Sequence, residues 1–293
     1  MDTLFKSLIW VKSPLNYTGG KFKLLPQILP HFPQDIDTFV DMFAGGCNVG
    51  INAPANNIIC NDIIPYLIDI FNLFKQSQKA DILDKINSRI SEFKLDAYNE
   101  DAYTKFRDYY NSDPNPLDLY ILVAHSFNYQ IRFNSKHKYN NPFGKTNSTF
   151  NNAMKKNLSL FIDKLKETNI QFITHDFIEL DLSTLTQSDF VYCDPPYLIT
   201  TGAYNDGKRG FKGWSTIEEK QLLNLLESLN EKGIRFALSN VFYHKGKFNE
   251  ILISWVEKHN LRVEHLKKNY ASSSYHTLDR SKNGSDEVLI MNY

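Results

Sequence analysis

The chain has 293 residues, of which 42% are hydrophobic and 23% are charged. This length and composition exclude a disordered tail or a fibrous repeat, and they suit one large core or a core with a smaller inserted domain. Lys and Arg number 33 and Asp and Glu number 33, so the formal net charge of zero indicates no class of partner.

Targeting and redox features predict a cytoplasmic protein. No apolar run approaches the roughly 18 residues of a membrane span, so we expect no membrane contact. The first residues lack an apolar segment followed by a small-residue cleavage site, so we do not expect export. The three cysteines form no CxxC pair, which predicts reduced thiols. The histidines show no metal-ligand spacing, and we expect no metal.

Apolar segments rich in β-branched residues alternate with helical patterns along most of the chain. This alternation predicts an α/β fold with a mostly parallel sheet. Ligands of such sheets gather at the carboxyl ends of the strands, so residues that follow strands are the first candidates for a site. We expect strands at 38–43, 57–60, 170–174, 189–193, 234–238, 261–265 and 287–291.

The first candidate motif precedes all of these strands. Tyr17 is followed by Gly19, Gly20 and Lys21. The motif is not a phosphate-binding P-loop, because Phe22 stands where that loop has Ser or Thr. The segment is either a surface turn before a helix or an aromatic and lysine clamp on the polar part of a ligand.

A glycine turn follows the first predicted strand. Asp41 and Phe43 lead into Gly45 and Gly46, and glycine there lets a ligand approach the backbone closely. Asp62 ends the next strand, at about the 20-residue spacing of an acid that binds ribose hydroxyls. The turn alone is weak evidence for a site, and Asp62 strengthens it.

The alternation breaks between about 73 and 167. Residues 79–118 have a polar helical pattern with nine acids and six bases, whereas residues 125–165 hold seven bases and one acid. Residues 127–140 have the pattern of a β-hairpin. We therefore expect a mostly helical domain inserted at 73–167 into an α/β domain formed by 1–72 and 168–293, with its basic side at the hairpin.

The sharpest motif is Asp194-Pro195-Pro196-Tyr197, which follows an apolar strand. The prolines stop that strand and hold a carboxylate, a carbonyl and an aromatic ring in fixed relation. The Asp194 carboxylate and the Pro195 carbonyl suit an aromatic amine, which is a poor nucleophile because its lone pair is delocalised. Tyr197 suits stacking on a base swung out of a duplex. A proline-rich strand exit without function would contain the same residues.

The last third of the chain contains two predicted helices. Ser215 and Glu218 have the spacing of a capping box, and leucines at helical spacing predict a helix over 216–231 that Gly233 ends. A second helix is expected over 248–259. Two basic loops, 208–212 and 244–247, are either solvated or in contact with phosphates.

Together these motifs resemble the DNA adenine-N6 methyltransferases of the Dam type, in which a lysine motif, a glycine motif, an inserted recognition segment and the Asp-Pro-Pro-Tyr motif follow in this order. The resemblance implies a Rossmann-like sheet that binds S-adenosylmethionine. It assigns 1–72 and 168–293 to the catalytic domain and 73–167 to DNA target recognition. Cys47 departs from a position that is often glycine, and we expect a small tolerated residue there. The residues that the resemblance places at the cofactor are Tyr17, Lys21, Asp41, Phe43, Gly45, Asp62, Asp176, Phe177 and Asp194, and those that it places at the target adenine are Asp194, Pro195, Pro196 and Tyr197.

The resemblance also makes the hairpin a reader of double-stranded DNA. Arg132 would read guanine through paired donors, and Asn128 would pair with a base edge or a phosphate. Phe127 would fill the gap left by a flipped base. Members that methylate GATC usually carry glycine and an aliphatic residue where this chain has Tyr129 and Gln130, which disfavours GATC as the target. The candidate DNA-binding residues are Phe127, Asn128, Gln130, Arg132, Asn134, Lys136, Lys138 and Pro142.

The resemblance thus implies a site-specific methyltransferase acting on N6 of adenine, in a restriction-modification or protective role. A restriction endonuclease acting on the same site is a further candidate partner. The alternatives are methylation of cytosine N4, a DNA-binding module of the same fold without catalysis, and methylation of RNA or protein. The aspartate of the Asp194 motif favours adenine over cytosine.

Overall fold

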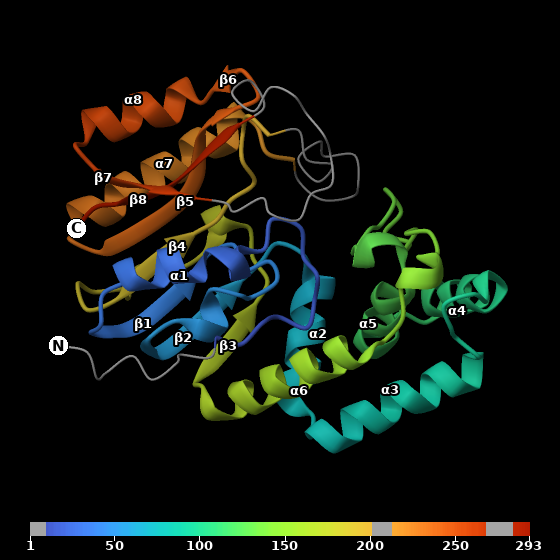
Figure 1. Cartoon of the computed structure of the whole chain (residues 1–293). Coiled ribbons are helices and arrows are strands. Elements are labelled where there is room, and N and C mark those ends of the chain that lie inside the picture. Colours follow the sequence, from blue (N-terminus) through green and yellow to red (C-terminus); the bar gives the residue numbers. More distant parts are fainter. Residues whose placement is uncertain (1–9, 201–212, 268–283) are drawn as a thin grey trace.

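The computed structural model describes residues 10–200, 213–267 and 284–293. Within these residues the strands form one sheet with the order β3-β2-β1-β4-β5-β8-β7, and β6 pairs with β5 at its edge. Figure 1 shows the sheet with helices on both faces and a group of helices to one side. The strands are β1 (Ile36–Asp41), β2 (Ala55–Asn61), β3 (Ile170–Ile173), β4 (Phe190–Cys193), β5 (Arg235–His244), β6 (Lys247–Phe248), β7 (Arg262–Leu266) and β8 (Ser285–Met291).

The seven predicted strands are all present, and the predicted α/β class is confirmed. The five strands β1 to β5 are parallel, whereas β8 runs antiparallel to both β5 and β7. Strand β5 continues past the predicted end at 238 because Ser239 and Asn240, although polar, are fully buried and pair with β8. Strands β2 and β3 lie on one side of β1, whereas β4 and the strands after it lie on the other side, so the strand order changes direction between β1 and β4. In an open α/β sheet such a switch point forms a crevice at the carboxyl ends of the strands.

Alternate residues of the strands face two helical layers. Phe39 belongs to the core beneath η1 (Lys21–Leu24), α1 (Leu25–Ile28) and η2 (Leu29–His31), whereas Val40 belongs to the core beneath α7 (Thr216–Glu231) and α8 (Glu250–Lys258). This alternation follows from the two-residue period of a strand. The predicted capping box at Ser215 and Glu218 starts α7.

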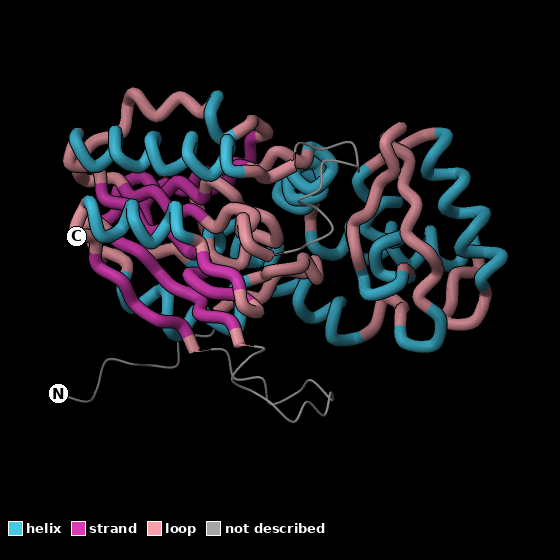
Figure 2. Tube along the Cα trace, turned by 90° about the horizontal axis from the view of Figure 1, so that it is seen from above, coloured by secondary structure: helices cyan, strands magenta, loops and turns pink. Residues whose placement is uncertain are grey.

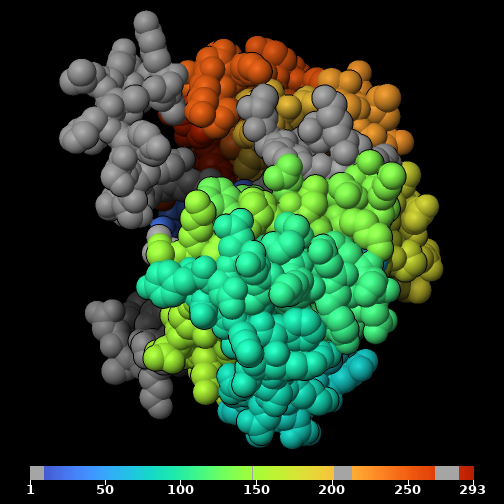
Figure 3. Space-filling view, turned by 90° about the vertical axis from the view of Figure 1, so that its right-hand side faces the viewer, coloured from blue at the N-terminus to red at the C-terminus, as the bar shows by residue number. Residues whose placement is uncertain are grey.

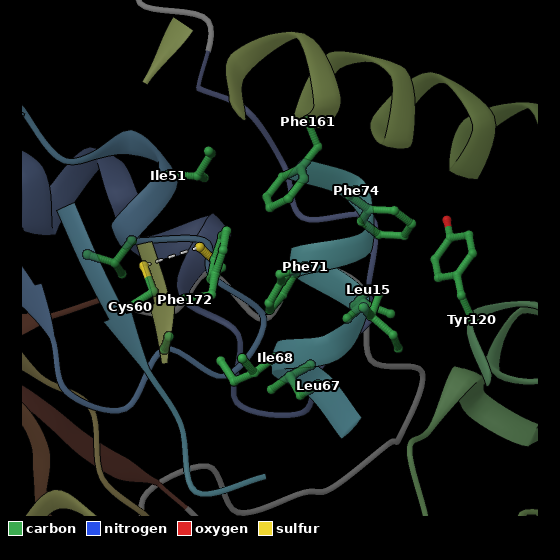
Figure 4. Packing of buried hydrophobic residues seen from close by; sticks show 14 of the residues in the cluster. Leu15, Ile51, Cys60, Leu67, Ile68, Phe71, Phe74, Tyr120, Phe161 and Phe172 are labelled. Carbon is green, nitrogen blue, oxygen red and sulfur yellow. Dashed lines mark hydrogen bonds between the residues drawn. The ribbon is translucent and has the colours of Figure 1, made fainter. Parts of the chain in front are cut away.

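The stretch between β2 and β3 contains five α-helices. Phe71 packs on Phe172 of the sheet and on Phe161, and Phe74 packs edge-on against Tyr120 (Figure 4). Buried residues of these helices and of the sheet therefore share one hydrophobic cluster. No helix among the described residues is long and apolar enough to cross a membrane. The five helices are α2 (Pro65–Gln76), α3 (Lys79–Phe93), α4 (Glu100–Ser112), α5 (Pro116–His125) and α6 (Asn152–Glu167).

The predicted hairpin is present as two loop arms rather than as regular strands (Figure 2). Isolated antiparallel bridges join Ser126 to Phe143 and Phe133 to Tyr139. Regular strands do not form because the backbone at 128–129 is left-handed, with φ of 54° and 55°. In addition, the Asn141 side chain donates to backbone carbonyls that a strand ladder would use. Figure 3 shows the helical part of the chain, coloured cyan to yellow-green, over the middle and lower part of the face turned to the viewer.

Candidate active site

A cavity of about 620 Å³ lies at the carboxyl ends of β1 and β4, at the switch point of the sheet. Its volume falls in the usual range for a small-molecule site. Its wall contains the three predicted motifs together with part of the 126–144 loop. All nine residues expected at the cofactor and all four of the Asp194 motif line it: Tyr17, Lys21, Asp41, Phe43, Gly45, Asp62, Asp176, Phe177, Asp194, Pro195, Pro196 and Tyr197.

Tight packing joins the lysine motif to the glycine turn. The Tyr17 ring lies so close to Gly45 that a Cβ atom there would be 3.0 Å from two ring carbons, and Gly45 has a φ of +48°. Gly20 donates its backbone N–H to the Tyr17 carbonyl at 3.1 Å, which closes the turn before Lys21. The close approach of the Tyr17 ring and the positive φ both favour glycine at position 45. The glycine is therefore explained by the fold of this site.

Two carboxylates stand at the ends of β1 and β2. Asp62 accepts backbone N–H groups of Gly45 at 2.9 Å and Ile64 at 3.0 Å, and burial raises its pKa to about 6. Asp41 accepts the N–H of Gly50 on Oδ2 at 3.1 Å, whereas its buried Oδ1 has no hydrogen-bond partner among the described residues. Burial, and next the charge of Asp194, raise the pKa of Asp41 to about 8. The free oxygen therefore suits a cationic ligand group.

The Asp194 motif is held by a buried lysine. Lys21 Nζ lies 2.7 Å from Asp194 Oδ1, and the Tyr197 hydroxyl lies 3.1 Å from the same oxygen. Burial raises the pKa of Asp194, and the charge of Lys21 opposes that rise. Asp194 Oδ2 accepts no hydrogen bond from any described residue. Oδ1 of the carboxylate is thus held by Lys21 and Tyr197, and Oδ2 is available to a ligand.

An aromatic cluster forms another part of the wall. The rings of Phe43, Phe177 and Trp214 lie with their centroids between 5.4 and 5.6 Å apart. Trp214 donates its indole N–H to Glu219 at 2.7 Å, and Asn249 donates to the other oxygen of that buried carboxylate. The cluster is therefore fixed in place and presents flat apolar faces to a ligand.

The predicted hairpin residues lie in three kinds of surroundings. Gln130 and Arg132 line the cavity, and their side chains make no hydrogen bond with the described residues. Phe127, Asn128, Lys136 and Pro142 are exposed. Asn134 accepts the backbone N–H groups of residues 136 and 138, and Lys138 donates to the Asn111 carbonyl, so these two side chains stabilise the loop. His244 and Lys245 of one basic loop line the cavity, whereas the other loop, 208–212, lies outside the described residues.

Two residues of the site, Trp214 and Glu287, lie outside the motifs predicted from the sequence. Trp214 precedes the α7 capping box, and Glu287 of β8 lies 3.5 Å from Lys21 Nζ. The sequence signal for Glu287 is an acid directly before the apolar run 288–291 of the last strand. The three cysteines are free, in agreement with the predicted reduced thiols, and the structure also shows that they are buried. In the described part of the chain, no group of His, Cys, Asp or Glu residues could hold a metal ion.

Comparison with known proteins agrees with this geometry. The chain is 51% identical over 288 residues to the type II methyltransferase M.FokI of Planomicrobium okeanokoites, and 51% identical over 284 residues to the modification methylase StsI of Streptococcus sanguinis. These alignments cover 98% and 97% of the chain, but the chain spans only 44% and 43% of those relatives. The DNA adenine methylase of Escherichia coli strain K12 is 23% identical, over 88% of the chain and 89% of that protein.

The sequence pattern of one family covers most of the chain. It matches residues 17–273 and so takes in the lysine motif, the glycine turn, the helical stretch and the Asp194 motif. The strand order, the cavity at the switch point and the position of Asp194 fit the same assignment. The chain belongs to the D12 class N6 adenine-specific DNA methyltransferase family.

Proposed function

We propose that this chain transfers a methyl group from S-adenosylmethionine to N6 of adenine at specific sites in double-stranded DNA. The observation that carries the proposal is Asp194 at the end of β4, whose Oδ1 is held by Lys21 and whose Oδ2 takes no bond from the described residues. In this proposal residues 1–72 and 168–293 form the catalytic domain, and residues 73–167 recognise the target.

The chain's own residues fit the proposed methyl donor. The cofactor would supply a methyl group made electrophilic by a sulfonium centre. Asp41 Oδ1 is a partner for its amino group, Asp62 for its ribose hydroxyls, and the aromatic cluster for its adenine and cationic parts. Asp176, which caps the turn at Phe177, supplies a polar group beside that cluster.

The Asp194 motif would hold the target base. Asp194 Oδ2 and the Pro195 carbonyl accept the two protons of the amine, which favours a tetrahedral nitrogen with a localised lone pair. Tyr197 supplies a ring for stacking on the flipped base. Pro195 and Pro196 stiffen this segment, so little order is lost when the base enters. Cys47 Sγ is buried, 3.6 Å from Cys60 Sγ, and we assign it no role as a nucleophile.

The loop 126–144 would read the DNA. It lies in the stretch 125–165 that holds seven bases and one acid, and its Arg132 and Gln130 side chains are available at the cavity. Arg pairs with guanine, and Gln pairs with adenine. The relatives named as type II and modification methylases support a role beside a restriction endonuclease with the same target.

The test is to methylate duplex DNA with the purified protein and to identify the modified nucleoside. We expect N6-methyladenine in one sequence context. N4-methylcytosine would show the alternative base, and the absence of any methylated nucleoside despite cofactor binding would favour a DNA-binding module without catalysis.

A tryptophan signal is expected to report cofactor binding. In a Trp10→Phe, Trp255→Phe background, Trp214 is the one remaining tryptophan of the three. Its emission should change saturably with S-adenosylhomocysteine, because its ring would contact the adenine. Trp214→Ala should weaken binding by about 1–2 kcal/mol, or about 5–30-fold. Calorimetric binding without an emission change would contradict this placement.

Cofactor affinity is expected to rise with pH. Because the pKa of Asp41 is raised to about 8, its carboxyl is largely protonated at pH 7 and becomes a partner for an ammonium group only as pH increases. Calorimetry with S-adenosylhomocysteine should show tighter binding between pH 6.5 and about 8.5, and Asp41→Asn should remove most of this dependence.

The Asp41 carboxyl also makes the stability of the ligand-free protein depend on pH, and here the effect of rising pH is unfavourable. Its pKa is above its unfolded value of 3.8, so the ligand-free protein loses stability as pH rises from about 4 to 8. Asp41→Asn should therefore raise Tm relative to wild type at pH 8 and much less at pH 5. An equal Tm difference at both pH values would contradict the assignment.

A further inference from the structure

Glu287 belongs to neither of the two loops that form the catalytic end of the cavity, yet it contacts both. It lies on β8 with a side chain that is 3% exposed. Its Oε1 is 3.5 Å from Lys21 Nζ and accepts a hydrogen bond from the Tyr197 hydroxyl at 3.1 Å. Glu287 thus ties the lysine motif and the Asp194 motif to the sheet.

The same two donors also reach Asp194. Lys21 Nζ is 2.7 Å from Asp194 Oδ1, and the Tyr197 hydroxyl is 3.1 Å from it. A phenol has a single proton, so the two carboxylates compete for it. Lys21 has three protons and also donates to the Gly19 carbonyl at 3.2 Å, which leaves it enough donors for both acids.

We propose that Glu287 is a positioning residue, which shares Lys21 and Tyr197 with Asp194 and so keeps Asp194 Oδ2 available to the target amine. The inference rests on the proposed methyl transfer. Without the Glu287 charge, both donors would turn fully to Asp194. The Asp194 carboxylate would then accept less well from the amine, and the Tyr197 ring would lose its anchor to the sheet.

The electrostatics of the cluster support this role and supply a readout. Burial raises the pKa of Asp194, the charge of Lys21 lowers it, and the negative charge of Glu287 raises it further. Removing the charge should therefore lower the pKa of Asp194 and move the acidic limb of the kcat profile to lower pH. Among the described residues, the other charged and titratable groups that act on Asp194 or feel its charge are Asp41 from β1, Tyr192 and Cys193 from β4, and Tyr197.

Glu287→Gln removes the charge and keeps the size of the side chain. The matched control is Asp286→Asn on the same strand, where the side chain instead pairs with His265 at 2.7 Å and is 39% exposed. We expect Glu287→Gln to lower kcat about 100-fold, to change the KM for S-adenosylmethionine less than about threefold, and to shift the acidic limb downward. Asp286→Asn should match wild type in all three.

A double-mutant cycle provides a second test. Tyr197→Phe removes the shared hydroxyl but keeps the ring, so its effect on kcat should be smaller in the Glu287→Gln background than in wild type. Additive effects in the cycle, or wild-type kcat and pH profile for Glu287→Gln, would overturn the inference. If Glu287→Gln does not bind S-adenosylhomocysteine by calorimetry, the cycle is replaced by Tyr197→Phe alone, which must then lower kcat without weakening that binding. Absence of methyl transfer in the wild-type protein would refute the proposed function instead.

Discussion

Replacing Asp194 with alanine is expected to lower kcat for methyl transfer by about 10²–10³-fold. Its carboxylate is the charged acceptor at the end of β4, and Oδ2 takes no bond from the described residues, so this oxygen is available to the target amine. The buried Lys21, only 5% exposed at its side chain, would also lose its nearest anion. Transfer of a tritiated methyl group to duplex DNA measures the effect under single-turnover conditions.

Controls separate this chemical effect from unfolding. Asp194→Asn keeps the size of the side chain and should be nearly as inactive, because an amide is a weaker acceptor and also offers a donor to the target amine. Asp181→Ala removes an exposed acid from the turn before β4 and should keep wild-type turnover. Wild-type turnover in Asp194→Ala would refute the proposed function.

Arg132→Ala is expected to relax sequence specificity at one position of the DNA target. The Arg132 guanidinium lines the cavity and makes no hydrogen bond or ion pair with the described residues, so it is available for paired contacts with guanine. Its loss should cost about 1–3 kcal/mol of discrimination at a G·C pair. Methylation of a library of duplexes with one substituted base pair measures this change position by position.

Lys136→Ala is the matched comparison on the same loop. Lys136 is exposed, and its side chain does not line the cavity. Loss of the Lys136 side chain should weaken binding to all duplexes equally and reduce the salt dependence of binding by about one charge. If Arg132→Ala produced the same uniform loss, Arg132 would be a phosphate contact rather than a reader of guanine.

Local sequence patterns were sufficient to predict most of the fold. Each of the seven predicted segments contains a strand. Strand β4 is buried at all four residues and has the continuous apolar run of a strand covered on both faces, whereas β7 is partly exposed and carries polar residues. The helix over 216–231 was predicted with its bounds, because its cap and its leucine spacing are properties of neighbouring residues. The hairpin was predicted less well, since side chains such as Asn141 compete with strand pairing there.

By itself, the sequence determined which motifs exist and where they lie relative to the predicted strands. Tyr17 to Lys21, the glycine turn, Asp62 and Asp194 were identifiable because their residue types and spacing carry the chemistry locally. The tertiary structure alone decided which distant residues meet. Glu287 reaches Lys21 and Tyr197 because β8 inserts antiparallel between β5 and β7, and Trp214 reaches Phe43 because α7 starts beside the end of β1. Such contacts join residues far apart in the chain, so they depend on strand order and packing, which no local pattern specifies.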